Sequence, residues 1–214
     1  MKAIIQFFTA GGPFMVPLVI CSVVGLAIII ERTIALQRKR IVPMSLEDAI
    51  HHFQPGGDTQ ILQGIAMGES SSLGRLVQRI LAHADSPKAD NIDALQVCGR
   101  AETVRMERGL VTLEIIVGIA PLLGLLGTVS GLITVFAAFG RGEKESMAEA
   151  MQIAAGISEA LNMTVAGLVV AIPALVIHAY YSRRIEHYMS EIEGLCLDLL
   201  AKLYKPAPTP PAGN

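Results

Sequence analysis

The sequence has few charged or aromatic residues and no tryptophan. Only 17% of its 214 residues are charged, 5% are aromatic, and the net charge is −2. This balance leaves no basic surface for nucleic acid, which argues against DNA or RNA as partners. The three cysteines have no CxxC or Cys/His ligand spacing, and no Ser/His/Asp or phosphate-loop motif is present. We therefore expect no metal site, no bound cofactor and no enzymatic activity.

Apolar residues are what the sequence has in excess. They make up 52% of the chain, and its mean hydropathy of +0.52 lies outside the range of soluble proteins. A bilayer core needs about 20 helical residues to cross it, and residues 14–30, 113–139 and 153–177 each supply about that length. We predict an all-α integral membrane protein with three transmembrane helices. Glu31 and Arg32 follow the first segment at once, a flank that argues against a cleaved signal peptide.

Basic residues predict the orientation. Of the 17 Lys and Arg residues, 14 fall within residues 31–112 and 178–214. Because basic residues close to span ends stay in the cytoplasm, we predict a periplasmic N terminus and a cytoplasmic C terminus. The loop at residues 140–152 then faces outward and is too short for a soluble domain.

The parts outside the spans differ in character. Residues 1–30 open with an apolar stretch that is either an interfacial helix or the top of the first span. Residues 31–112 predict a cytoplasmic helical loop leading into the second span. No proline lies between Asn91 and the second span, so one helix can run on into the membrane.

The C-terminal part predicts a helix and then a tail. Residues 178–204 continue the third span as an amphipathic cytoplasmic helix, and residues 205–214, with four prolines, predict a disordered tail. The long helical extensions are either a rigid vestibule and assembly surface or ordinary packing within one subunit.

Small residues in the second and third spans predict close helix packing. Gly127 and Gly131 form a GxxxG match that lets another helix approach. The packing candidates are Pro121, Gly124, Gly127, Gly131, Gly167 and Pro173. At 100° per residue, most of these packing candidates lie within about 60° of Thr128 or Thr164. We therefore interpret Thr128 and Thr164 as occupying equivalent positions on two helices that face each other.

Polar residues in the spans have two interpretations each. A membrane threonine commonly bonds a carbonyl of its own helix, so Thr128 and Thr164 are either structural or part of an ion path. Glu159 is a candidate for such a path, because an acid near a helix centre costs about 3 kcal/mol to insert; alternatively, it is solvated near the outer interface. We predict that Glu114 lies at the cytoplasmic interface and that His178 is a residue at the end of the third span whose side chain snorkels toward water.

Two segments carry a resemblance to a known family. Residues 120–131, which contain Pro-x-x-Gly-x-x-Gly-Thr-x-x-Gly, and residues 159–174 resemble the second and third spans of the MotA/TolQ/ExbB proton-channel family. The opening Gly-Gly-Pro at residues 11–13 is similar to ExbB-like members. Three spans fit ExbB and TolQ, whereas MotA-type stators have four.

The resemblance implies a motor subunit of the bacterial inner membrane, driven by the proton motive force. A ring of such subunits, typically five, would surround two single-span ExbD/TolR-type partners, each of which brings a proton-binding aspartate. Thr128 and Thr164 match the pore threonines of the family, and Glu159 matches its acid on the third span. An ExbB-like role, with TonB as the envelope partner, is preferred to a TolQ-like role with TolA. A passive scaffold remains an alternative, whereas a self-contained transporter would need its own charged or broken-helix site.

Overall fold

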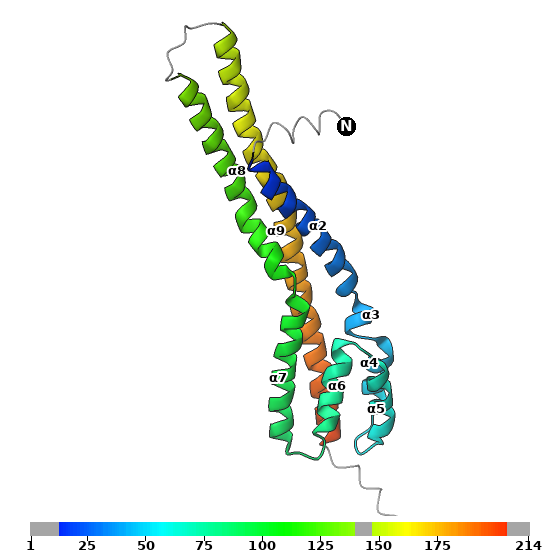
Figure 1. Ribbon diagram of the computed structural model, residues 1–214. Coiled ribbons are helices and arrows are strands. Elements are labelled where there is room, and N and C mark those ends of the chain that lie inside the picture. Colours follow the sequence, from blue (N-terminus) through cyan, green and yellow to red (C-terminus); the bar gives the residue numbers. More distant parts are fainter. Residues whose placement is uncertain (1–12, 140–146, 205–214) are drawn as a thin grey trace, which may run out of the picture. The chain divides into compact units, whose positions relative to one another are not determined.

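The computed structural model describes residues 13–139 and 147–204, and all regular structure within these residues is helical (Figure 1). This confirms the predicted all-α class. The helices are α2 (Met15–Ala35), α3 (Arg38–Ile41), α4 (Met44–His52), α5 (Thr59–Gly68), α6 (Ser72–Ala82), α7 (Lys88–Glu107), α8 (Leu110–Phe139) and α9 (Met147–Leu203). The expected interfacial segment, most of the expected outer loop and the expected tail lie outside the described residues.

The chain divides into two compact units. The first contains residues 1–31 and 109–180, and the second contains residues 32–108 and 181–214. Both α2 and α9 continue from one unit into the other. Because α9 begins at Met147, the last six residues of the expected outer loop are helical.

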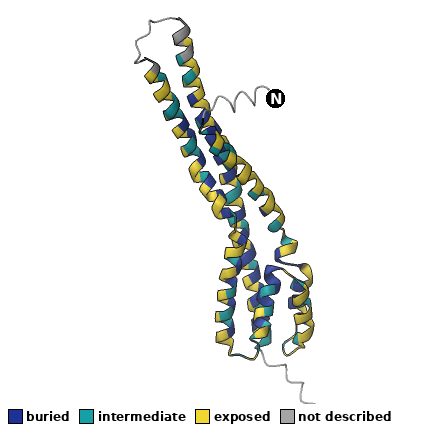
Figure 2. Cartoon of the chain, in the orientation of Figure 1, coloured by how far each residue is buried: buried dark blue, intermediate teal, exposed yellow. Residues whose placement is uncertain are grey.

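The first unit contains the apolar helices. Three helices are long and apolar enough to cross a membrane: Met15–Ala35, Leu110–Ala137 and Ile153–Leu203, each with a mean hydropathy of 2.2 over its most apolar window. Many of their apolar side chains are exposed, as the yellow stretches of α8 and α9 illustrate (Figure 2). Leu122, Ile133 and Val169 are 62%, 63% and 65% exposed. Such surfaces are stable only in apolar surroundings, which is the environment that a bilayer supplies.

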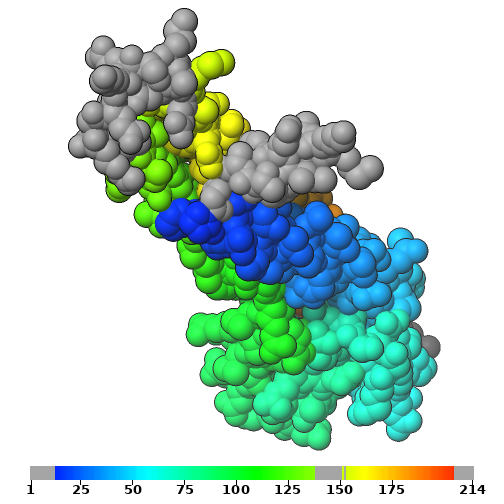
Figure 3. All heavy atoms as spheres, turned by 45° about the horizontal axis from the view of Figure 1, so that its top comes forward, coloured from blue at the N-terminus to red at the C-terminus, as the bar shows by residue number. Residues whose placement is uncertain are grey.

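Helix α2 packs on both other helices of the first unit. Met15 and Leu18 are buried in one cluster with Ala120 of α8 and Met163 of α9. Gly25 lies over α8, where an added Cβ would be 3.6 Å from Ile116 Cδ1. In the space-filling view α2 (blue) lies at the surface (Figure 3).

The second unit is a helical bundle with its own core. Many of its fully buried apolar side chains come from α4, α6 and the C-terminal part of α9. They include Leu46, Ile50, Leu73, Leu76, Ile80, Ile185, Ile192 and Leu199. Side-chain bonds fasten the end of α9 to this core. Lys202 Nζ donates to the carbonyls of Ile50 and His51 at 2.9 and 3.0 Å, and thereby satisfies the last turn of α4.

The expectation that one helix runs from near Asn91 into the second span is wrong. Helix α7 ends at Glu107 and α8 begins at Leu110. Between them Gly109 has φ 80°, a left-handed conformation that only glycine adopts readily. Arg32, only 9% exposed, donates from Nη1 to the Met106 carbonyl at 3.1 Å and so caps the end of α7. The absence of proline from a segment is therefore not sufficient to keep a helix continuous, because a glycine and a capping arginine can also end it.

Candidate functional site

Helices α8 and α9 touch through their backbones. A Cβ added at Gly167 would lie 2.6 Å from the Ala120 carbonyl oxygen, and one added at Gly124 would lie 2.8 Å from that of Met163. Real side chains do not fit at such distances. The two glycines therefore permit a contact that alanine would prevent, as expected of small residues at a membrane helix interface.

The same contacts give the register of the pair. Gly131 meets Ala160, Gly127 meets Met163, and Gly124 meets Gly167. From the first contact to the last, seven residues back along α8 are matched by seven residues forward along α9. The two helices are thus antiparallel over this stretch and keep one register.

This register brings the two threonines to one level. Thr128 follows Gly127, Thr164 follows Met163, and Gly127 contacts Met163. Because the helices run in opposite directions, the residues that follow the contact pair lie on the same side of it. Both threonines are half-buried. Thr128 Oγ1 donates to the Leu125 carbonyl at 2.7 Å, so its hydroxyl proton is used within α8 while its oxygen can still accept a bond.

Helix α2 covers the opposite side of the pair. Its Met15 and Leu18 share one buried cluster with Ala166, and Leu123 packs against that cluster. At 100° per residue, Leu123 lies about 140° round α8 from Thr128, and Ala166 about 160° round α9 from Thr164. On the side that carries the threonines, the neighbouring side chains of α8 and α9 are apolar. We call it the threonine face and define it as Pro121, Leu125, Thr128, Leu132, Leu161, Thr164 and Leu168.

Glu159 does not belong to the threonine face. It precedes Thr164 by five residues, which turns it about 140° round α9 toward the side of α2. Its side chain is exposed. The structure therefore brings Thr128 and Thr164 together and leaves Glu159 apart from both.

Prolines occur inside both helices. Pro121 lies on the threonine face and has no N–H, so the Val117 carbonyl lacks its usual helical donor. Pro173 lies inside α9 and is exposed. Pro121 was predicted only as a packing residue, although a proline inside a helix is itself the signal that the carbonyl four residues earlier lacks this donor.

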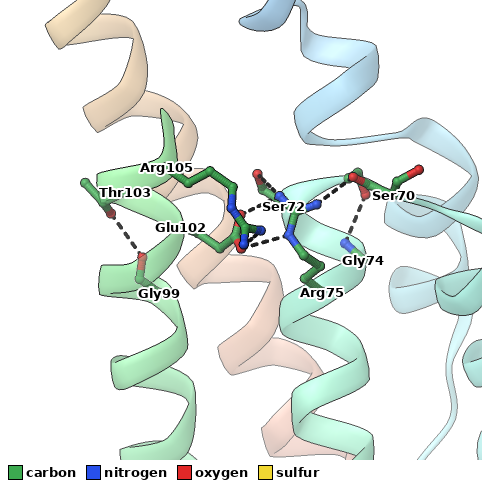
Figure 4. Close-up of polar contacts among 9 residues, drawn as sticks. Ser70, Ser72, Gly74, Arg75, Gly99, Glu102, Thr103 and Arg105 are labelled. Carbon is green, nitrogen blue, oxygen red and sulfur yellow. Dashed lines mark hydrogen bonds and ion pairs between the residues drawn. The ribbon is translucent and has the colours of Figure 1, made fainter. Parts of the chain in front are cut away.

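The second unit contains a buried ionic cluster (Figure 4). Glu102, 3% exposed, accepts hydrogen bonds from Arg75 Nε at 2.8 Å and Arg105 Nη1 at 2.8 Å. Burial opposes the charge of this carboxylate, but the hydrogen bond from Arg75 and the two guanidinium charges outweigh it, so the pKa of Glu102 lies below its usual value. Every charge in the cluster has a partner, which is typical of a structural ion pair. Among the described residues no group of three His, Cys, Asp or Glu side chains could hold a metal ion.

Comparison with known proteins decides the family. The family model of the MotA/TolQ/ExbB proton channel family matches residues 68–194, more than half of the chain. The chain belongs to this family. The match includes all of α8 and the part of α9 that carries Thr164, so the threonine face lies within it.

Individual relatives of this MotA/TolQ/ExbB member carry ExbB names. The chain is 32% identical over 214 aligned positions to the ExbB-like biopolymer transport protein 1 of Synechocystis sp., with 94% of this chain and 82% of the relative covered. It is 29% identical to the biopolymer transport protein exbB1 of Vibrio cholerae, with 90% and 85% covered. A shorter match to ExbB of Salmonella typhimurium reaches 37% over 95 residues, 44% of this chain and 38% of the relative. Together with the three apolar helices, the family identifies a multi-pass membrane protein and a proton-channel subunit.

Proposed function

We propose that this chain is the ring-forming subunit of a proton-driven motor in the bacterial inner membrane, with the threonine face lining the proton path. The observation that carries the proposal is the pairing of Thr128 and Thr164 at one level, on the side of the α8–α9 pair that α2 leaves uncovered. Two hydroxyl oxygens in an apolar wall can accept hydrogen bonds from a protonated group. They cannot themselves carry a proton at neutral pH.

A partner must then supply the proton carrier. The threonine face carries no acid near the level of the threonines, and Glu159 lies on the other side of α9. A single-span ExbD/TolR-like helix with one aspartate would meet this need. In a low-dielectric pore that aspartate prefers its neutral form, so alternating wet and dry exposure would couple protonation to a step between ring and core.

The larger assembly follows from the resemblance. We infer a ring of five copies around two partner helices, a periplasmic N terminus and a cytoplasmic C terminus. Torque would pass to a TonB-like envelope protein, and the ExbB names of the relatives favour this role. A TolQ-like role with a TolA-like protein is the second candidate.

The test replaces the hydroxyls without changing side-chain shape. Thr128→Val and Thr164→Val should each reduce proton flux about tenfold or more in vesicles containing the chain and its single-span partner, and abolish energised work in a complementation assay. Thr134→Val is the matched control, because Thr134 lies on another side of α8 and bonds the Ser130 carbonyl at 3.0 Å. Full activity of both pore variants would contradict the proposed path.

Glu159 needs its own experiment, because it lies apart from the threonines. If it serves proton movement, Glu159→Gln should lower flux in vesicles that contain equal amounts of assembled protein. If the variant only accumulates to a lower level and each assembled copy conducts normally, Glu159 is structural.

A further inference from the structure

Two titratable side chains lie at one end of the threonine face, near the start of α8. Glu114 is 14 residues before Thr128 on α8, and His178 is 14 residues after Thr164 on α9. Because the helices are antiparallel, both displacements run in the same direction, by roughly 21 Å at 1.5 Å per residue. Glu114 and His178 therefore lie at the same level as each other, just as the two threonines do.

Both side chains also stay on the threonine side. Fourteen residues at 100° each make almost four full turns, so Glu114 lies only about 40° round α8 from Thr128, and His178 only about 40° round α9 from Thr164. The register persists to this end, since Leu113, Ile116 and Ala174 form one buried cluster against which Val117 and Ile177 pack. Leu113 is 1% exposed while its neighbour Glu114 is exposed, which agrees with a carboxylate turned away from the contact.

Neither group is engaged by the rest of the described chain. Within residues 13–139 and 147–204, no hydrogen bond or ion pair involves the side chain of Glu114 or His178. Of the titratable groups of α2, Cys21 packs against the buried cluster of Leu113, Ile116 and Ala174, and Glu31 and Arg32 lie near the end of that helix. Tyr180 follows His178 by two residues and so lies about 160° away round α9.

A polar group lies between the threonines and this pair. The Val117 carbonyl, deprived of its helical donor by Pro121, is three residues from Glu114. The other side chains of the face in this interval, such as Leu125 and Leu168, are apolar.

We propose that Glu114 and His178 form a proton-exchange station, where protons pass between the threonine path and the water at this end of the spans. The inference rests on the proposed function and names two further residues for it. A proton leaves the carboxylic acid of the partner, crosses by water to the Glu114 carboxylate or a His178 ring nitrogen, and is then released to bulk water. Imidazole suits this task, because it binds and releases protons near neutral pH.

The first experiment tests the placement of the two residues. In a chain whose native cysteines are replaced, Glu114→Cys with His178→Cys should be joined by a short, rigid bismaleimide, as detected by mass spectrometry of the linked peptides. Glu114→Cys with Tyr180→Cys is the matched control, since Tyr180 is nearly level with His178 but faces away. Equal cross-linking of both pairs, or cross-linking of the control pair alone, would overturn the placement.

The second experiment tests the role of the pair. In vesicles containing the chain and its partner, Glu114→Gln combined with His178→Gln should lower proton flux about tenfold or more and flatten its dependence on pH between 5 and 8. Glu193→Gln, an exposed acid farther along α9, should leave both properties unchanged. Thr128→Val is measured in the same series. If it conducts normally, the proposed function has failed; if it is blocked while the double variant keeps normal flux and pH dependence, only the exchange station is overturned.

Discussion

Burial controls the reactivity of individual side chains in the second unit, and Cys196 is the clearest case. Its side chain is fully buried, and burial raises the pKa of its thiol to about 12, because a thiolate loses its hydration there. At pH 8 we expect iodoacetamide to modify Cys196 in the folded chain about a hundredfold or more slowly than in the unfolded chain. Peptide mass spectrometry over time measures the rate, with half-buried Cys98 as an internal comparison. Equal rates in the folded and unfolded chain would contradict the buried position.

Glu102 gives a prediction for stability and its pH dependence. Its pKa is lowered in the folded state, so its ion pairs stabilise the fold above the unfolded pKa, and this contribution is lost as the pH falls through the folded pKa. Glu102→Gln should reduce the free energy of unfolding by about 1–3 kcal/mol at pH 7. The difference from the unmodified chain should shrink in acid.

Thermal unfolding in detergent at pH 7 and pH 4, followed with a thiol-reactive dye, measures this effect. Glu107→Gln is the control, because Glu107 is an exposed acid on the same helix. A constant difference between the Glu102 variant and the unmodified chain at both pH values would show that the ion pairs do not account for its stabilising role.

At the scale of elements, the α8–α9 contact depends on glycines at particular positions. Gly124→Ala and Gly167→Ala would each force the two backbones apart, since the added Cβ meets a carbonyl oxygen at 2.8 and 2.6 Å. We expect each to cost about 1–3 kcal/mol in stability. Gly118→Ala is the matched control on α8, because nothing lies within 4 Å of its added Cβ. Alanine there should be neutral or stabilise the helix by about 0.5–1 kcal/mol.

Melting temperature in detergent, together with the amount of folded chain recovered from membranes, distinguishes these variants. If Gly118→Ala lowered stability as much as Gly167→Ala, helix propensity or lipid contact would account for the loss and the close approach of α8 and α9 would not.

For the whole molecule, the first unit exposes apolar side chains and two half-buried threonines that the described chain does not cover. Such a surface needs lipid or other chains against it. From the proposed function we expect native mass spectrometry of the detergent-purified chain to detect five copies, and co-expression with the single-span partner to add partner helices. A monomer or dimer that does not bind the partner would favour the passive scaffold, in which the two threonines serve only helix packing.

Much of this protein follows from the sequence by itself. Apolar length determines the three spans, because a bilayer requires a fixed number of helical residues. The Pro-x-x-Gly-x-x-Gly-Thr-x-x-Gly segment indicates the family. Helical periodicity already separates Glu159 from Thr164 by about 140°, so the sequence alone could have predicted that the two side chains lie on different sides of α9.

The register between helices and the ends of helices are decided by the tertiary structure, because helical periodicity does not contain this information. A pattern on one helix does not give its register against another, and only the contact of Gly127 with Met163 brings Thr128 level with Thr164. Likewise, the left-handed Gly109 and the Arg32 cap end α7 through backbone conformation and a bond to a residue 74 positions away. Local sequence determines which residues can form a helix, whereas contacts between distant segments determine where the helix ends and which face remains free for function.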